Sequence, residues 1–256
     1  MLDLSTSAPP IVFLHIPKTA GQSVHNELVR AVGQPAVSPV RVHTQSSTPE
    51  GQLPDGYQLY SGHIDWTALD QIPKPRFVFS VLRDPRERIA SFYFYLLKEA
   101  RLLDADALSA PQNAGKRAIL ESSADEYFFG GDEAWQAFIL DHYDNFYCRY
   151  FGTKRIRSGP DFAAKPERRK LRGALRNLHK IDWIYSVENL TALEDDLRTL
   201  YGFELDLTNT HNNVGDRPIS ELRWPRLLAR FENDANQARL EEFIKLDVAL
   251  MQHLEL

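Results

Sequence analysis

Residues 17–23 combine a lysine, two hydroxyl side chains and a glycine where a short apolar run gives way to a helical pattern. The first turn of a helix presents unpaired N–H groups and the positive end of the helix dipole, so an anion is stabilised there. Lys18 would add a full charge, Thr19 and Ser23 would add hydroxyl donors, and Gly21 would let the backbone approach the anion closely. We therefore expect an anion-binding loop that comprises Lys18, Thr19, Ala20, Gly21, Gln22 and Ser23.

The lysine of this loop precedes the glycine by three residues. A Walker A loop requires the lysine directly after a glycine, so residues 17–23 are not a Walker A motif. A tight strand-to-helix turn with a solvated lysine is the alternative interpretation. The spacing alone leaves both interpretations open.

A second set of basic side chains follows an apolar segment at residues 76–82. Arg83 lies at the expected start of a helix, where a guanidinium and the helix dipole act together on an anion. Arg86 and Arg88 lie in the first turn, where cations are unfavourable unless an anion or a carboxylate compensates them. Ser91 follows Arg83 by eight residues. A second anion site and an exposed basic turn both fit this pattern, and spacing alone does not show that Arg83 and Ser91 converge.

Apolar segments and helical patterns must position these residues. Strands are expected at residues 11–15, 59–64, 76–82 and 183–187. Asp84 and Glu87 predict a capping box at the start of a helix that extends to about residue 103. Further helices are expected near residues 24–32, 114–123, 132–144, 163–179, 190–201, 219–231 and 233–254. Strands that alternate with helices predict an α/β fold with a parallel sheet covered on both faces.

Length and composition limit the class of protein. The chain has 256 residues, of which 43% are apolar and 25% are charged, so residues 1–256 are expected to form a single domain. No run of 18 apolar residues predicts a membrane span, and no signal peptide is evident. Cys148 is the only cysteine and has no partner for an internal disulfide. A cytoplasmic protein is expected.

The charge pattern disfavours nucleic acid as a partner. The net charge is −5, whereas nucleic-acid binders carry a basic surplus. Residues 154–180 depart from this balance, with ten basic residues and two acidic ones. They predict an amphipathic helix with a solvated charged face, or alternatively a positive rim that attracts an anion. The histidines show no metal-ligand spacing, so no metal is expected.

Together, the two anion-binding segments resemble those of sulfotransferases that use 3′-phosphoadenosine 5′-phosphosulfate (PAPS). The residues His15-Ile16-Pro17-Lys18-Thr19-Ala20-Gly21-Gln22-Ser23 are similar to their 5′-phosphosulfate loop. The segment Arg83-Asp84-Pro85-Arg86-Glu87-Arg88-Ile89-Ala90-Ser91-Phe92-Tyr93 resembles their 3′-phosphate segment, in which an arginine and a serine share the phosphate. The sequence of the first motif most resembles that of the branch that contains the heparan and chondroitin glycan sulfotransferases.

Weaker similarity to that branch continues along the chain. It covers Tyr60-Ser61-Gly62-His63-Ile64, residues 144–152, residues 184–188 and His211-Asn212-Asn213. The resemblance implies a P-loop-NTPase-like three-layer sandwich with a central parallel sheet and additional C-terminal helices. It also implies PAPS as co-substrate, no metal, and a hydroxyl-bearing glycan or small molecule as acceptor. The oligomeric state and the acceptor's identity cannot be predicted.

The resulting functional hypothesis is in-line transfer of a sulfuryl group to an acceptor hydroxyl. Lys18 would stabilise charge on the bridging oxygen, and Arg83 and Ser91 would bind the donor. A small-molecule or nucleoside kinase is the first alternative, but it predicts a Walker A lysine and a magnesium-binding carboxylate. A non-enzymatic module with a degenerate pocket is the second, and it predicts the loss of Lys18, Arg83 or Ser91, all of which are present.

His63 is the candidate base that accepts the proton of the acceptor hydroxyl. Histidine has an unperturbed pKa of about 6.5, which suits proton transfer near neutral pH. His63 ends a predicted strand, and ligands of parallel α/β sheets bind at the carboxyl ends of strands. A packed histidine at a strand end is the alternative interpretation. Asp65 and His15 are the next candidates for the base.

Overall fold

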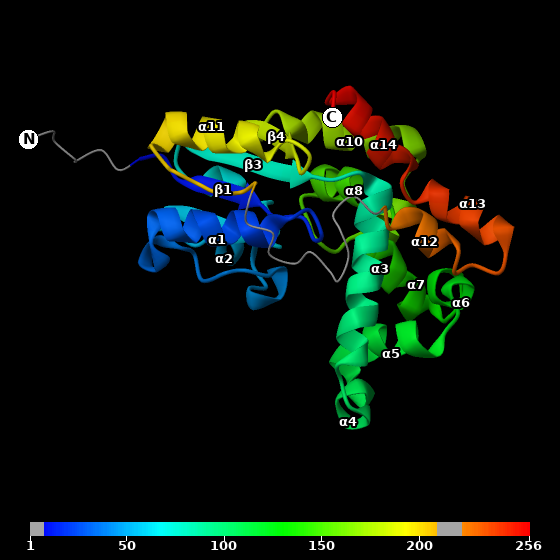
Figure 1. Ribbon diagram of the computed structural model, residues 1–256. Helices are drawn as coiled ribbons and strands as arrows, with labels where there is room; N and C mark the ends of the chain where they lie inside the picture. Colours follow the sequence, from blue (N-terminus) through cyan, green and yellow to red (C-terminus); the bar gives the residue numbers. More distant parts are fainter. Residues whose placement is uncertain (1–7, 209–221) are drawn as a thin grey trace, which may run out of the picture.

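The computed structural model describes residues 8–208 and 222–256 (Figure 1). Four parallel strands form a sheet in the order β2-β1-β3-β4. They comprise β1 (Ile11–Leu14), β2 (Leu59–Gly62), β3 (Phe77–Leu82) and β4 (Trp183–Ser186). All four predicted strands are therefore present, and the predicted α/β fold with a parallel sheet is confirmed. Strands β1, β2 and β3 are buried throughout, which explains their nearly continuous apolar sequence.

Helices cover both faces of the sheet. On one face, α1 (Gly21–Val32) and α11 (Leu190–Tyr201) contribute Val24, Leu28 and Leu193 to a core with alternate strand residues such as Phe13 and Phe79. On the other face, α8 (Phe146–Thr153), α10 (Glu167–Leu178) and α14 (Lys245–His253) pack against the remaining strand residues. This arrangement gives three layers.

A second group of helices lies beyond the carboxyl edge of the sheet. Helix α3 (Pro85–Arg101) follows β3 and extends away from the sheet, and shorter helices gather around it (Figure 1). These are α4 (Ala105–Ser109), α5 (Ala114–Glu121), α6 (Ala124–Phe129), α7 (Glu133–His142), α12 (Trp224–Leu228) and α13 (Asp234–Glu242). Their apolar side chains form a separate cluster rich in aromatic rings. Helix α3 therefore connects the sheet to a mainly helical core.

Two predicted helices differ in their bounds from the structure. The pattern at 163–179 corresponds to α10, which begins later than predicted because Pro166 disfavours helical backbone at the residue before it, and the preceding α9 (Gly159–Ala163) was not predicted. The pattern at 233–254 comprises α13 and α14, which residues 243–244 separate. Of the pattern at 219–231, the structure describes α12, while residues 219–221 and the motif His211-Asn212-Asn213 lie outside the described residues.

Several short helices were not predicted. In α8, six of the eight residues are buried, so the segment has no polar face whose spacing would indicate a helix. Residues 33–57, for which the sequence predicts no helix or strand, contain α2 (Pro49–Gln52). By contrast, α10 is amphipathic as predicted, with Ala174 buried and Arg168, Arg169, Arg172 and Arg176 exposed. Within the described residues, no helix is both long and apolar enough to cross a membrane.

Candidate functional site

A cleft of about 1080 Å³ lies at the carboxyl edge of the sheet. The segments that follow β1, β2 and β3 all contribute to its walls, as expected for a parallel α/β sheet. Its lining includes nearly all of the residues predicted from the sequence: Lys18, Ala20, Gly21, Gln22, Ser23, His63, Arg83 and Ser91. The structure thus brings together two segments whose convergence the spacing alone could not establish.

The loop between β1 and α1 has an unusual backbone. Lys18 and Ala20 have φ angles of 72° and 58°, in the left-handed region that non-glycine residues seldom occupy. Ala20 is the N-cap of α1, and no described side chain caps this helix end, whose first turn also contains no acidic residue. The Ser23 N–H donates to the Ala20 carbonyl oxygen at 3.2 Å, so the N–H groups of Gly21 and Gln22 are those that remain available to an anion.

Thr19 differs from the sequence-based expectation. Its hydroxyl is buried and donates a hydrogen bond of 3.0 Å to the carbonyl oxygen of Ile16. Because a hydroxyl has a single proton to donate, Thr19 stabilises the loop from inside instead of offering a side-chain donor to the cleft. Ser23, the other predicted hydroxyl donor, lines the cleft.

Lys18 has a strongly perturbed ammonium group. Its Nζ lies 4.0 Å from the centroid of the Tyr95 ring, a cation–π contact within the cleft. Burial above all lowers the pKa of Lys18, the charges of Arg83 and Arg223 act in the same direction and Glu99 opposes them, so that the pKa is about 8. An anionic ligand would relieve this electrostatic penalty and restore the charged form.

The start of α3 contains the second predicted anion-binding segment. The Asp84 carboxylate accepts a hydrogen bond of 3.0 Å from the Glu87 N–H and caps the helix as predicted. The reciprocal hydrogen bond of a capping box, from the Asp84 N–H to the Glu87 carboxylate, is absent from the described residues. Instead, Glu87 accepts hydrogen bonds from the N–H groups of Arg223 and Trp224, at 2.7 and 2.9 Å, and lies 3.8 Å from the Arg83 guanidinium. Glu87 thereby connects the Arg83 site to the start of α12.

The three arginines of this segment have different environments. Arg83 lines the cleft with Ser91. Arg86 forms an ion pair of 2.9 Å with Glu241. Arg88 is buried, and its guanidinium donates to the carbonyl oxygen of His142 and lies over the Phe146 ring. Arg86 is thus paired with a carboxylate, whereas Nε and Nη1 of Arg88 are buried without a hydrogen-bond partner among the described residues. Of the three arginines, Arg83 is the one that lines the cleft.

The ring of His63 has a defined tautomer. Its Nδ1 lies 2.7 Å from the carbonyl oxygen of His15, and because a carbonyl only accepts, Nδ1 must carry the proton. In the neutral ring, Nε2 then has a free lone pair and can accept a proton. Burial lowers the pKa of His63, the hydrogen bond to His15 opposes this, and nearby Arg41, His43 and Lys18 lower it further.

Gly62 allows a neighbouring segment to approach His63. A Cβ at Gly62 would lie 2.3 Å from the carbonyl oxygen of Arg41, closer than atoms can pack. This close approach permits the parallel bridge between Val42 and His63 and brings His43 to the cleft wall. The sequence contained no spacing signal for His43, because a long loop separates it from the other site residues.

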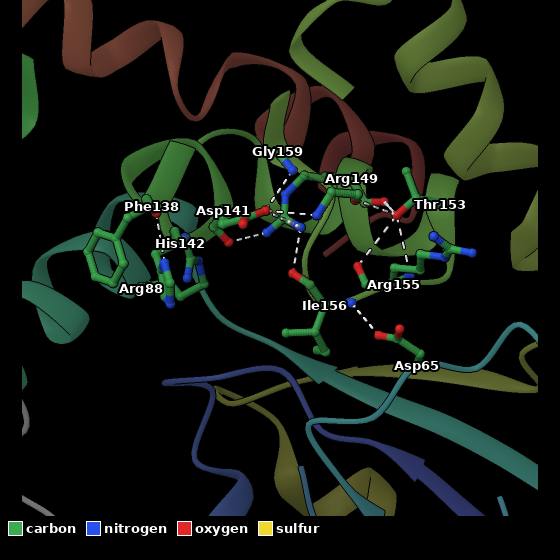
Figure 2. A network of polar contacts seen from close by, with 11 residues as sticks. Asp65, Arg88, Phe138, Asp141, His142, Arg149, Thr153, Arg155, Ile156 and Gly159 are labelled. Carbon is green, nitrogen blue, oxygen red and sulfur yellow. Dashed lines mark hydrogen bonds and ion pairs between the residues drawn. The ribbon is translucent and has the colours of Figure 1, made fainter. Parts of the chain in front are cut away.

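A buried polar network positions one end of the cleft (Figure 2). The Arg149 guanidinium donates to the carbonyl oxygens of Asp141 and Ile156, the latter at 2.6 Å. The Asp141 carboxylate accepts from the Ser158 and Gly159 N–H groups, at 2.7 and 2.6 Å. Residues 156–159 are thereby fixed, and Arg157, Asp141 and His142 line the cleft.

Asp65 belongs to this network. Its carboxylate accepts a hydrogen bond of 2.8 Å from the Ile156 N–H. Asp65 is not among the described residues that line the cleft. This geometry gives Asp65 a structural role, whereas His63 lines the cleft. Cys148 is also buried, which raises the pKa of its thiol. In the described part of the chain, no group of three or more His, Cys, Asp or Glu side chains is arranged to hold a metal ion.

Comparison with known proteins identifies the family. The model of the sulfotransferase family matches residues 5–144, which is just over half of the 256 residues. The match includes β1, β2, β3 and α3, and hence both anion-binding segments and His63. No curated protein matches the chain significantly. The chain belongs to the sulfotransferase family.

Proposed function

We propose that residues 1–256 form a single sulfotransferase domain that transfers the sulfuryl group of PAPS to a hydroxyl group of a carbohydrate. The observation that carries this proposal is that Lys18, Arg83, Ser91 and His63 line one cleft. Two separate helix starts there suit a donor with anionic groups at two positions. The resemblance to the branch of glycan sulfotransferases supports a carbohydrate acceptor.

The donor would extend between the two anion-binding segments. Its 5′-phosphosulfate would bind the loop 17–23 and the start of α1, and its 3′-phosphate would bind Arg83 and Ser91. Between them, Leu190, Thr191 and Leu207 provide a partly apolar wall for the nucleoside. The acceptor would then occupy the side of the cleft formed by His43 and Arg157.

The reaction is an in-line displacement at sulfur. The acceptor oxygen forms a bond to sulfur while the bond between sulfur and the bridging oxygen breaks, which releases adenosine 3′,5′-bisphosphate. The proton of the acceptor hydroxyl moves to Nε2 of His63, whose Nδ1–H is held by the His15 carbonyl. The Lys18 ammonium stabilises the negative charge that develops on the bridging oxygen.

Ligand-dependent thermal unfolding tests the donor assignment. Adenosine 3′,5′-bisphosphate at about one hundred times its Kd should stabilise the protein by about 2.7 kcal/mol. Magnesium-ATP should stabilise it much less, because it has no 3′-phosphate for Arg83 and Ser91. Equal or greater stabilisation by magnesium-ATP would favour a kinase instead.

A His63→Ala variant tests the assigned base. Its kcat, measured with radiolabelled PAPS and an acceptor found by screening, should fall by about 10²–10⁴-fold. Affinity for the bisphosphate should remain nearly unchanged, and the acidic limb of the pH–rate profile should vanish. Normal turnover with an unaltered acidic limb would exclude His63 as the base.

A further inference from the structure

His15 lies between the anion-binding loop and His63. Its ring stacks on Phe13, with centroids 5.2 Å apart, and its centroid lies 4.2 Å from that of His63. Its main-chain carbonyl accepts the Nδ1–H of His63, and its ring lines the cleft. One residue therefore contacts the candidate base through both its backbone and its side chain.

The same ring fills the space beside Gly21. A Cβ at Gly21 would lie 1.9 Å from Cδ2 and 2.0 Å from Nε2 of His15, so only glycine accommodates this packing. Because Cα–Cβ bonds tilt toward the start of a helix, the ring lies at the entrance of the first turn of α1. An anion bound by the start of α1 would occupy the same region.

The proton of the His15 ring belongs on Nε2. Nδ1 is buried and has no hydrogen-bond partner among the described residues. A buried N–H without an acceptor is costly, so the tautomer with a bare Nδ1 and an Nε2–H is favoured. Burial above all holds the pKa of His15 well below its usual value, and neighbouring His63 and Arg41 reinforce this. The ring is therefore a neutral donor.

We propose that His15 is a further binding and positioning residue, whose Nε2–H donates to an oxygen of the 5′-phosphosulfate group while its carbonyl fixes the tautomer of His63. This inference rests on the proposed function of the cleft. A neutral donor adds a hydrogen bond for the developing charge without adding a further cation to Lys18, Arg83 and Arg223. The dual role also connects the position of the donor to that of the base, because displacement of His15 would disturb both.

A His15→Phe variant tests the contribution of the ring. Phenylalanine keeps an aromatic ring and the main-chain carbonyl but removes the Nε2–H. We expect kcat to fall by about 10²–10³-fold, the effect of removing one such donor, while the acidic limb assigned to His63 persists. His25→Phe is the matched control, because His25 is a buried histidine of α1 that contacts Ser61 and is not among the described lining residues. A kcat of His15→Phe within about threefold of that control would overturn the proposal.

Nitrogen-15 NMR of the unmodified protein gives a second, independent measurement, which also decides the matter if His15→Phe does not fold. The His15 ring should show a protonated Nε2, and its signal should shift when adenosine 3′,5′-bisphosphate is added. A protonated Nδ1, or a signal unmoved by saturating bisphosphate, would overturn the proposal. Activity of His63→Ala separates the two ideas: an impaired His63→Ala with an unimpaired His15→Phe refutes the role of His15 alone. The reverse result refutes the assigned base.

Discussion

The protonation of Lys18 should control the alkaline side of the pH dependence. Burial and the charges of Arg83 and Arg223 lower its pKa to about 8 in the unliganded protein, whereas an unperturbed lysine has a pKa of about 10.4. Only the ammonium form can stabilise the leaving group. Because the folded-state pKa is below the ordinary value, the protonated fraction of Lys18 in the free enzyme is lost as the pH rises through 8.

The pKa of about 8 fixes the expected magnitude. About nine-tenths of Lys18 is protonated at pH 7 and about one-tenth at pH 9, so kcat/KM should fall by about tenfold between these values. Bound bisphosphate should raise the pKa of Lys18, because opposite charges favour the ammonium. Binding at pH 8 should therefore take up about half a proton, and affinity should weaken as the pH rises further.

Two assays measure these quantities. Initial rates between pH 6 and pH 10 give the alkaline limb, and calorimetric titration with bisphosphate in buffers of different ionisation enthalpy gives the proton uptake. In Lys18→Arg the alkaline limb of the pH–rate profile and the proton uptake on binding should both vanish, because a guanidinium stays charged throughout this range. In Lys18→Ala, kcat should fall by about 10²–10³-fold. A wild-type kcat/KM that is constant up to pH 10, or an unchanged limb in Lys18→Arg, would refute the reasoning.

Two further predictions concern the donor site and the polar network. Arg83→Ala and Ser91→Ala should each weaken bisphosphate binding, measured by calorimetry. Both variants should change kcat much less than Lys18→Ala does. A loss of kcat at unchanged affinity would contradict the assignment of Arg83 and Ser91 to the donor site. Arg149→Met should lower the free energy of unfolding by about 3–5 kcal/mol in chemical denaturation, because it leaves Asp141 without its buried partner, and a change below 1 kcal/mol would contradict that role.

The sequence was sufficient to predict the sheet, and both segments that it singled out for anion binding line the cleft. The four strands are continuous apolar runs that end at residues capable of chemistry, so their local signals agree with the fold. Ser91 lies within the first two turns of α3, which keeps it close to the start of the helix and to the cleft that Arg83 also lines. The hydroxyl of Thr19 is bonded inside the loop and not offered to the cleft, because spacing does not indicate which way a hydroxyl turns.

The remaining site residues depend on contacts between distant segments. His43 reaches the cleft through a backbone bridge that only Gly62 permits. Arg157 is placed there by Arg149 and Asp141, whose hydrogen bonds join three separate segments (Figure 2). None of these contacts has a periodic signal in the sequence. Even α8, which contains Arg149, has no polar face that would indicate a helix.

The electrostatics of the cleft favour a ligand with several negative charges. Burial is the main cause of the lowered pKa of Lys18, and repulsion of its ammonium group by Arg83 and Arg223 adds to it. Glu87 lies 3.8 Å from the Arg83 guanidinium and 3.9 Å from that of Arg223, and so offsets part of this repulsion. A singly charged anion could neutralise one of the three cations and leave the other two in repulsion. A donor with anionic groups near both Lys18 and Arg83 would relieve the repulsion at both positions, so the cleft should bind a 3′,5′-bisphosphate more tightly than a 5′-monophosphate of the same nucleoside.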